Sequence, residues 1–141
     1  MATSKQDKFD IANKKNELYS DFLNNLNPHP VSGAVMRVVN ENAVTRSIKN
    51  LILTNRAERL YQPSIGSNVR KMLFEPMSDS TATSLSSLIR ETIDTHEPRA
   101  KVINVTVTPN LEKNMYGVDI VYMIINRQEP VSVNITLTRV R

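Results

Sequence analysis

The segment T-H-E-P-R near position 97 places three side chains side by side that could take part in proton transfer. His96 could shuttle a proton, Glu97 could act as a general acid or base, and Arg99 could hold an anion. Glu91 and Asp94 precede them and add two further carboxyl groups. Hydrolysis of a glycosidic bond needs two carboxyl groups on either side of the sugar, roughly 5 to 9.5 Å apart. A glycosidase site is therefore one hypothesis for these acids.

The surrounding sequence does not support catalysis. Nothing near these acids is suited to raise a pKa, and only 5% of the chain is aromatic, with no Trp to stack on a sugar. The chain has no Cys, and its other histidine, His29, lies between two prolines. No phosphate-binding, nucleotide-binding or calcium-loop motif occurs. We therefore expect no catalytic residue, no metal site and no cofactor, and we interpret the acids as the solvated last turn of a helix.

The spacing of apolar residues explains where this segment lies in the fold. Leu85, Leu88, Ile89 and Ile93 recur at helical spacing, and the polar residues around Ser78 are typical of a helix N-cap. Pro98 disfavours helical geometry for the residue before it, so the helix should end there. The motif E-P-R is then the corner between a helix and the strand that follows.

After this corner the apolar residues alternate with polar ones, which predicts three strands with one apolar face each. The residues expected on that face are Ile103, Val105 and Val107, then Val118, Ile120, Tyr122 and Ile124, then Val131, Val133, Ile135 and Leu137. Strands that follow one another with short connections are usually antiparallel. The sequence therefore predicts a single α+β domain, with helices packed on a small, mostly antiparallel sheet that ends in a C-terminal three-stranded meander.

The first half of the chain should supply the helices. Residues 41–54 and 68–74 have helical spacing, and Gly66 lies in a turn between them. Residues 1–30 are polar, and Leu18, Phe22 and Leu26 are spaced four apart, as in a short amphipathic helix. We therefore expect a partly helical N-terminal arm over residues 1–30 and the main domain over residues 31–141.

Charge and hydropathy limit the classes of partner that the protein is expected to bind. The net charge is +4, but the basic residues are spread over several elements without the aromatic-flanked motifs of nucleic-acid binders. The candidates for a basic face are Arg37, Arg46, Lys49, Arg56, Arg59, Arg70 and Lys71. No apolar run approaches the roughly 18 residues of a membrane span, and the N-terminus has no apolar signal segment. We expect no nucleic-acid partner and no membrane contact.

One longer stretch, S-I-K-N-L-I-L-T-N-R-A-E-R-L-Y-Q-P-S-I-G-S-N-V-R-K-M-L-F-E-P, is followed about twenty residues later by E-P-R. In this order the motifs resemble the small baseplate wedge proteins of contractile-tailed bacteriophages. That family carries a gene 25-like lysozyme label and includes a baseplate component of type VI secretion systems. The matching residues are Asn50, Glu58, Arg59, Pro63, Gly66, Leu73, Phe74 and Glu75, then Glu97, Pro98 and Arg99. Ala57 stands where the family usually has Gly, so the turn before Glu58 must tolerate a Cβ.

The resemblance implies a structural protein rather than an enzyme. Members look like the handshake domain of the tail sheath subunit, bind the larger wedge proteins and present the first ring on which sheath polymerises. Tail tube or hub proteins are further candidate partners, and six copies per baseplate are implied. The protein would be assembled in the host cytoplasm and be found in the virion tail baseplate. The alternative hypothesis is a tail-associated peptidoglycan hydrolase, a muramidase.

Two surfaces follow from these hypotheses. In the family the E-P-R corner faces the larger wedge proteins, so Glu97, Pro98 and Arg99 are candidate docking residues, with an internal brace from Arg99 to Glu58 or Glu75 as the alternative. A free sheet edge could accept a strand of the sheath. The residues assigned to that edge are Val131, Val133, Ile135, Leu137 and Arg139. The alternative for that strand is a closed position in the core.

Overall fold

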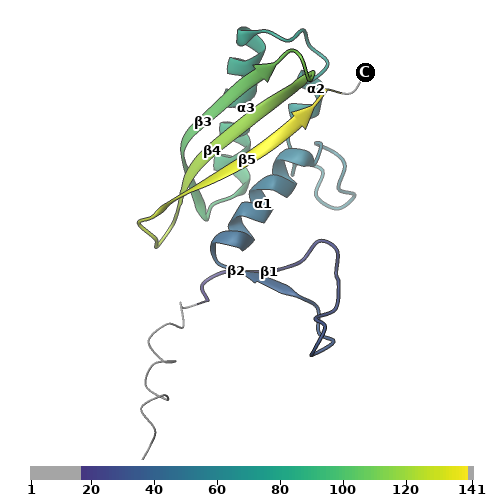
Figure 1. Ribbon diagram of the computed structural model, residues 1–141, viewed down its shortest axis with the longest axis vertical. Helices are drawn as coiled ribbons and strands as arrows, with labels where there is room; N and C mark the ends of the chain where they lie inside the picture. Colours follow the sequence, from purple (N-terminus) through teal and green to yellow (C-terminus); the bar gives the residue numbers. More distant parts are fainter. Residues whose placement is uncertain (1–16, 140–141) are drawn as a thin grey trace, which may run out of the picture. The chain divides into compact units, whose positions relative to one another are not determined.

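The computed structural model describes residues 17–139, and its contacts divide the chain into two units (Figure 1). Unit 1 is Met1–Ala43 and unit 2 is Val44–Arg141. The division by contacts lies after Ala43, and the arm expected over residues 1–30 stays a prediction. Among the described residues, no helix is both long and apolar enough to cross a membrane.

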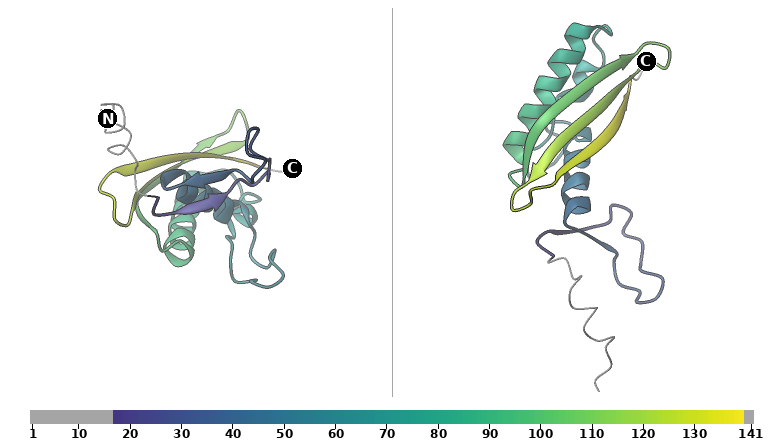
Figure 2. Two further views of the ribbon diagram at one scale, coloured as in Figure 1. Left: turned by 90° about the horizontal axis from the view of Figure 1, so that it is seen from below. Right: turned by 60° about the vertical axis from the view of Figure 1, so that its left-hand side comes forward.

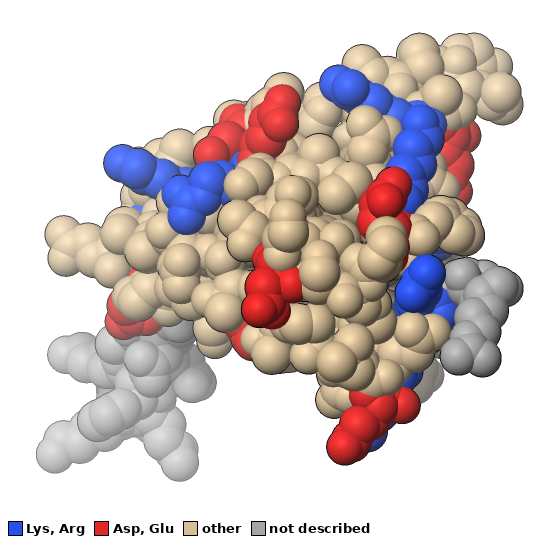
Figure 3. Space-filling view, turned by 90° about the horizontal axis from the view of Figure 1, so that it is seen from above, with Lys and Arg blue, Asp and Glu red and all other residues tan. Residues whose placement is uncertain are grey.

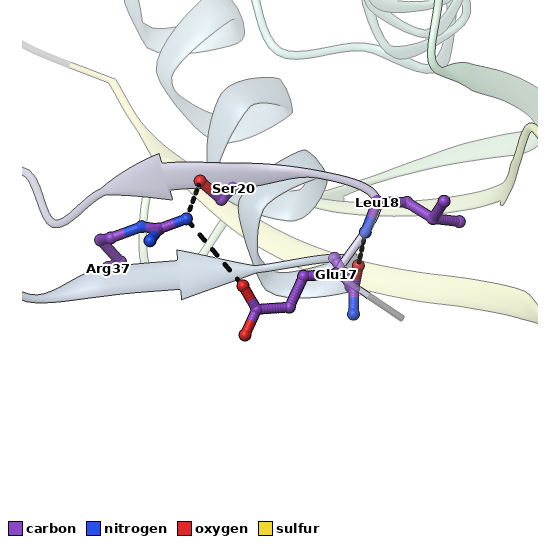
Figure 4. A network of polar contacts seen from close by, with 5 residues as sticks. Glu17, Leu18, Ser20 and Arg37 are labelled. Atoms are coloured by element: carbon purple, nitrogen blue, oxygen red, sulfur yellow. Dashed lines mark hydrogen bonds and ion pairs between the residues drawn. The ribbon is translucent and has the colours of Figure 1, made fainter. Parts of the chain in front are cut away.

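Unit 1 contains a short pair of antiparallel strands. Strand β1 (Ser20–Phe22) pairs with β2 (Arg37–Val39), and a bridge between Pro28 and Val35 continues the pairing. Polar contacts hold the two strands together (Figure 4). Arg37 Nη2 donates to Ser20 Oγ at 2.7 Å and lies 4.0 Å from a carboxylate oxygen of Glu17, while the backbone N–H of Leu18 donates to Asn40 Oδ1 at 2.9 Å.

The helix expected from Leu18, Phe22 and Leu26 is therefore wrong. These side chains are largely exposed, and Leu26 has a left-handed backbone conformation with φ of 50°, which ends any regular helix. Spacing by four predicts a helix only when the apolar face is buried by a neighbouring element. Here backbone bonds to residues 36–40 favour the extended conformation instead. The rest of the expected arm, residues 1–16, lies outside the described residues.

Unit 2 is built on a three-stranded antiparallel sheet in the order β3-β4-β5, as the sequence predicted. The strands are β3 (Ala100–Asn110), β4 (Met115–Ile124) and β5 (Pro130–Thr138). The helices are α1 (Glu41–Leu53), which begins before the division, α2 (Val69–Met72) and α3 (Asp79–His96). The helical part of unit 2 lies on one face of the sheet (Figure 2). The α+β class and the C-terminal meander are confirmed.

The core lies between that sheet face and the helices. The buried residues of α1 and α3 include Val44, Ile48, Leu51, Ile52, Leu85, Ile89 and Ile93. The buried residues of β4 and β5 are Tyr116, Val118, Ile120, Tyr122, Ile124, Val133, Ile135 and Leu137. The hydroxyl of Tyr122 lies 2.7 Å from Thr45 Oγ1, which ties α1 to the central strand. The other face carries exposed polar residues on β3 and β5, with the half-buried Met115, Val121 and Met123 on β4 between them.

Strand β3 departs from the predicted alternation. Ile103 was expected to face the core, but it is 46% exposed, whereas Val102 is 8% exposed. The register of β3 against β4 shifts between Val102 and Asn104, which places a β-bulge at Ile103. Because one extra residue reverses the face of the side chains that precede it, the bulge moves Val102 inward. Val105 and Val107, after the bulge, are half-buried.

The loop between α1 and α2 is closed by its own backbone bonds. The N–H of Ser67 donates to Thr54 O at 2.8 Å, and the N–H of Ala57 donates to Pro63 O at 2.9 Å. The stretch R-L-Y-Q-P is not a strand here but forms turns and bends. Gly66 has φ of 135°, and a Cβ on it would lie 2.7 Å from the Asn55 carbonyl group. Ala57 has φ of 67°, a left-handed conformation that Gly adopts without strain, which fits the Gly usual at this position in the family that the sequence resembles.

Two substitutions in this loop should change stability in opposite directions. Gly66→Ala adds a Cβ that clashes with backbone, so we expect the free energy of unfolding to fall by about 2–3 kcal/mol. Ala57→Gly removes a left-handed Ala, and we expect a gain of about 0.5–1 kcal/mol after the added chain entropy of Gly. Denaturant unfolding measures both changes.

Gly117→Ala is the control, because its Cβ would meet only Thr108 O at 3.9 Å in a regular strand. It should leave the protein equally or slightly more stable. A Gly66→Ala variant as stable as wild type, or an Ala57→Gly variant that is less stable, would contradict this account of the loop.

Candidate functional site

The E-P-R corner begins where α3 ends. The N-cap of α3 is Ser78, whose Oγ accepts the N–H of Thr81, and the helix ends at His96. Glu97 is the C-cap, and its N–H donates to Ile93 O at 2.8 Å. Pro98 follows in a turn, and β3 starts at Ala100. His96 is thus the last residue of a helix, as the sequence predicted, and shows no arrangement suited to a proton shuttle.

Glu97 and Arg99 form a two-pronged ion pair. Arg99 Nε donates to Glu97 Oε1 at 2.6 Å, and Arg99 Nη2 donates to Glu97 Oε2 at 2.8 Å. The Glu97 side chain is 4% exposed and that of Arg99 is 32% exposed. Burial acts to raise the pKa of Glu97, but hydrogen bonds from Arg99 and Ser47 and the charge of Arg99 outweigh it and lower that pKa. The carboxylate is therefore held in its charged form.

This geometry shows a brace with a different acid from the two expected. Arg99 pairs with Glu97 rather than with Glu58 or Glu75, and the Glu58 carboxylate instead accepts the N–H of Asn55 at 2.7 Å. Glu97 is buried, so it cannot be a docking residue by direct contact. Pro98 and the exposed part of Arg99 remain at the surface of this corner. The docking hypothesis then concerns these two residues, which Glu97 positions.

The three acids do not form a catalytic pair. Glu97 is engaged in the ion pair, while Glu91 and Asp94 are exposed on α3. Both border the same shallow hollow of about 290 Å³, together with Arg90 and Val105. Because they come from one helix, they do not face each other across a substrate. Among residues 17–139, no cluster of three or more His, Asp or Glu side chains could hold a metal ion.

The other motif residues have mostly local roles. Gly66 and Pro63 shape the loop described above, Leu73 is buried, and the backbone carbonyl of Asn50 accepts bonds from Thr54. Arg59, Phe74 and Glu75 are exposed, and Phe74 is 66% exposed. In the view from above, acidic and basic side chains are interspersed on the visible face (Figure 3).

Strand β5 lies at a free edge of the sheet, and two backbone bonds fix which groups it offers. The N–H of Arg139 donates to Asn114 O at 3.2 Å, and the N–H of Ile125 donates to Arg99 O at 3.0 Å. Successive N–H groups in an antiparallel strand point to opposite sides. With the register of Val118 opposite Ile135, the odd-numbered residues of β5 therefore donate toward β4. The residues whose N–H groups point to the free edge are Ser132, Asn134, Thr136 and Thr138.

The side chains assigned to this edge from the sequence are not its exposed groups. Val133, Ile135 and Leu137 are buried in the core, and Val131 is half-buried. Arg139 Nη2 donates to Phe74 O at 3.3 Å, so this guanidinium is engaged within the chain. Alternation in the sequence predicts which face of the sheet each side chain lies on. It does not predict whether a residue's N–H points toward β4 or toward the free edge. The polar residues between the apolar ones are those that a partner strand would meet.

The opposite edge, β3, is protected. The bulge at Ile103 interrupts it, and the carbonyl of Ile103 accepts a bond from Arg90 at 3.0 Å. Pro109 lies opposite Tyr116, so by the same parity its nitrogen, which lacks a hydrogen, faces outward. From Val131 to Thr138, β5 has no proline, no bulge and no charged residue. Proline, bulges and charges are the usual devices that prevent strand addition. In β5 the first residue, Pro130, is a proline whose nitrogen faces the free edge by the same parity, and the rest of the strand has none of the three.

An apolar hollow lies beside the C-terminal half of β5. Its volume is about 430 Å³, within the range of roughly 300 to 1,000 Å³ for sites that bind small molecules or side chains. Residues of α1, α2 and the segment after it form the lining with the end of β5. They are Leu53, Arg70, Leu73, Phe74, Thr136, Leu137 and Thr138. Sequence patterns did not predict this hollow, because its residues come together only in the fold.

Comparison with known proteins decides the family. The sequence model of the family described as baseplate wedge protein gp25 matches residues 38–129, more than half of the chain. The chain belongs to this family. The baseplate wedge protein gp25 of Enterobacteria phage T4 is 29% identical over 90 residues, which cover 61% of this chain and 68% of that protein.

Solved structures share the fold of the family. A Geobacter sulfurreducens protein described as a tail lysozyme has a TM-score of 0.68 at 20% identity, over 72% of this chain and 92% of that one. A chain of the anti-feeding prophage baseplate has a TM-score of 0.61 at 20% identity, over 87% of each chain. A chain of the type VI secretion baseplate complex has a TM-score of 0.53 at 14% identity, over 69% and 93%. The resemblance read from the motifs is confirmed, while β5 lies beyond the matched segment.

The ion pair of the corner should stabilise the isolated protein. Arg99→Ala leaves the buried Glu97 carboxylate without its partner, so we expect the free energy of unfolding to fall by about 2–4 kcal/mol. Because folding lowers the pKa of Glu97, its contribution is complete above about pH 4.3 and is lost as the pH falls through the folded-state pKa. The stability difference between wild type and Glu97→Gln should therefore shrink in acid. Denaturant unfolding at several pH values measures both effects.

Lys101→Ala is the matched control, since Lys101 is an exposed residue at the start of the same strand. It should change stability by less than about 0.5 kcal/mol. An Arg99→Ala protein that unfolds like wild type but fails to join a wedge would show that the corner is a docking point and not a brace.

Proposed function

We propose that this protein is a structural component of the baseplate wedge of a contractile tail. In this proposal it binds the larger wedge proteins and offers the edge of β5 to a strand of the first sheath ring. It would be located in the virion tail baseplate, in six copies, after assembly in the host cytoplasm. Membership of the wedge-protein family supports the first part, and the β5 edge, open from Val131 to Thr138, is the observation that carries the second.

The chemistry of the β5 edge defines the partner segment. N–H groups of alternate residues from Ser132 to Thr138 are directed outward, so an added strand would bond to them through its own carbonyl groups. The face of the sheet beside them is polar, with Asn134 Nδ2 donating to Asp119 Oδ1 at 2.6 Å. Backbone bonding of this kind does not depend on the side chains of the partner. Specificity must come from a neighbouring feature.

The apolar hollow beside Thr136 supplies that feature. Leu53 and Phe74 expose apolar surface around it, and Leu137 forms part of its buried lining. A large apolar side chain of the added strand would be removed from water there, which contributes about 1.5–3 kcal/mol for a Leu or Phe. Arg70 at the same hollow favours a nearby carboxylate on that strand. We therefore expect the partner strand to carry an apolar residue next to an acidic one.

The E-P-R corner is the second proposed contact. Pro98 is exposed on a turn whose geometry is fixed by the Glu97–Arg99 ion pair and by the Ala100 N–H donating to Glu97 O at 3.1 Å. The exposed part of Arg99 is oriented by Glu97 and could donate to carbonyl groups at a helix end of a wedge protein. A fixed turn of this kind loses little conformational entropy on binding. That property supports a docking role for Pro98 and Arg99.

The description of one structural relative as a tail lysozyme gives the hydrolase alternative a specific test. Because Glu91 and Asp94 lie on one helix and Glu97 is engaged with Arg99, we expect purified protein to clear no peptidoglycan. Glu91→Gln and Asp94→Asn should behave like wild type in the same turbidity assay, with hen lysozyme as the positive control. Clearing by wild type that either substitution abolishes would overturn the structural assignment in favour of a muramidase.

The edge proposal predicts opposite effects of proline at adjacent positions. Thr136→Pro removes an outward N–H and leaves the β4–β5 bonds intact, so the protein should fold and join the wedge but bind sheath about tenfold less tightly. Ile135→Pro removes a donor to β4 and should lower the thermal midpoint of the isolated protein. Thermal unfolding, wedge incorporation and sheath polymerisation on assembled baseplates measure the three outcomes.

Thr136→Val is the control, because it changes the same side chain but keeps the N–H. Sheath polymerisation on Thr136→Pro baseplates at the wild-type rate would show that β5 is not the acceptor edge. Loss of wedge incorporation in the same variant would show that this edge binds the wedge rather than the sheath.

A further inference from the structure

Two adjacent large side chains in the loop between α1 and α2 lie almost wholly in water. Leu60 is 92% exposed and Tyr61 is 97% exposed, the largest values for a Leu and a Tyr among the described residues. They contribute nothing to the core. Adjacent exposed residues of this size are typical of a surface that is covered by a partner. Figures 1 and 2 show the loop projecting to one side of the helices of unit 2.

The loop that carries this pair is held in place at its base. Asn55 and Ser67 form a bridge, and Ser67 Oγ donates to Ile52 O at 2.6 Å inside the core. The carboxylate of Glu58 accepts the N–H of Asn55, and the N–H of Ala57 donates to Pro63 O. These bonds close the chain on both sides of Leu60 and Tyr61. A pre-formed loop loses less conformational entropy when it binds, so its apolar residues can contribute more to affinity.

The charges beside the pair indicate the complementary surface. Arg59 directly precedes Leu60, is exposed, and among residues 17–139 has no ion pair or side-chain hydrogen bond. The one acid of the loop, Glu58, directs its carboxylate to the loop base. The tip therefore presents Arg59, Leu60 and Tyr61 together. Arg and Tyr are, with Trp, enriched where binding energy is concentrated at protein interfaces.

We propose that Leu60 and Tyr61 form a knob that inserts into an apolar groove of another wedge protein, with carboxylates of that protein at the rim to pair with Arg59. This inference rests on the proposed wedge function and adds a contact separate from the corner and from the β5 edge. The loop lies within residues 38–129, which the wedge-protein family model matches, whereas β5 lies outside them. That difference favours a wedge protein over the sheath as the owner of the groove.

The test uses full-length protein and purified larger wedge proteins from the same particle. The double variant Leu60→Ser, Tyr61→Ser should bind them about 30-fold less tightly, as expected for the loss of two interface anchors. Arg59→Glu should weaken binding by about tenfold and reduce its dependence on salt concentration. Because all three side chains are exposed, thermal unfolding of the variants should match that of wild type. Tyr61→Phe is the matched control and should bind nearly as well as wild type.

The segment of the partner that contacts the knob can be located by placing a photo-crosslinking phenylalanine analogue at position 61. We expect the crosslink to reach an apolar segment of a wedge protein with Asp or Glu nearby. Wild-type wedge binding by the double variant would overturn the knob, as would a crosslink only to sheath or binding only to anionic lipid vesicles. Failure of the Thr136→Pro test alone would remove the β5 edge and leave the knob in place, so the two failures are distinguishable.

Discussion

The ion pair between Glu97 and Arg99 connects the parts of unit 2. Glu97 caps α3, Arg99 leads into β3, and Ser47 of α1 also hydrogen-bonds to the Glu97 carboxylate. The Arg99 carbonyl accepts the N–H of Ile125 at the end of β4. One buried carboxylate therefore joins both long helices to the sheet at the point where the chain changes direction. A buried charge of this kind is stable only while its partner remains, so the corner specifies a single geometry.

This arrangement places both long helices on the same side of the sheet, so they cover one of its two faces. With α1 and α3 on the same side, the opposite face carries the polar residues of β3 and β5 beside Met115, Val121 and Met123 of β4. Among residues 17–139, the three strands leave two sheet edges unpaired. The two edges differ in the features that hinder strand addition. Edge β3 has a bulge, a carbonyl at Ile103 that accepts a bond from Arg90, and an outward proline at position 109. Edge β5 has no bulge, and its one proline, Pro130, lies at the start of the strand. This asymmetry supports the proposal that β5 accepts a partner strand.

Much of this fold could be predicted from local sequence patterns. The alternation of apolar and polar residues predicted β4 and β5. The helical spacing from Leu85 to Ile93 predicted α3, and Pro98 predicted where it ends. Prediction failed where distant residues decide the outcome: the bulge at Ile103 depends on pairing with β4, and the strand at Ser20–Phe22 depends on residues 36–40. At the site, the acid paired with Arg99 was missed although it lies two residues away, because a sequence does not show which carboxylate is buried.

The surfaces proposed for partners share a physical feature that the sequence motifs alone do not reveal. Pro98, the β5 edge and the Leu60–Tyr61 knob are each exposed, and each is fixed by bonds to buried groups nearby: the Glu97 carboxylate, strand β4, and the Ile52 carbonyl through Ser67. Family motif residues such as Gly66 and Glu97 act on the buried side of these surfaces. Their role is to position the residues beside them. The proposed function would need this division, because contacts that were themselves flexible would not define the geometry of an assembly.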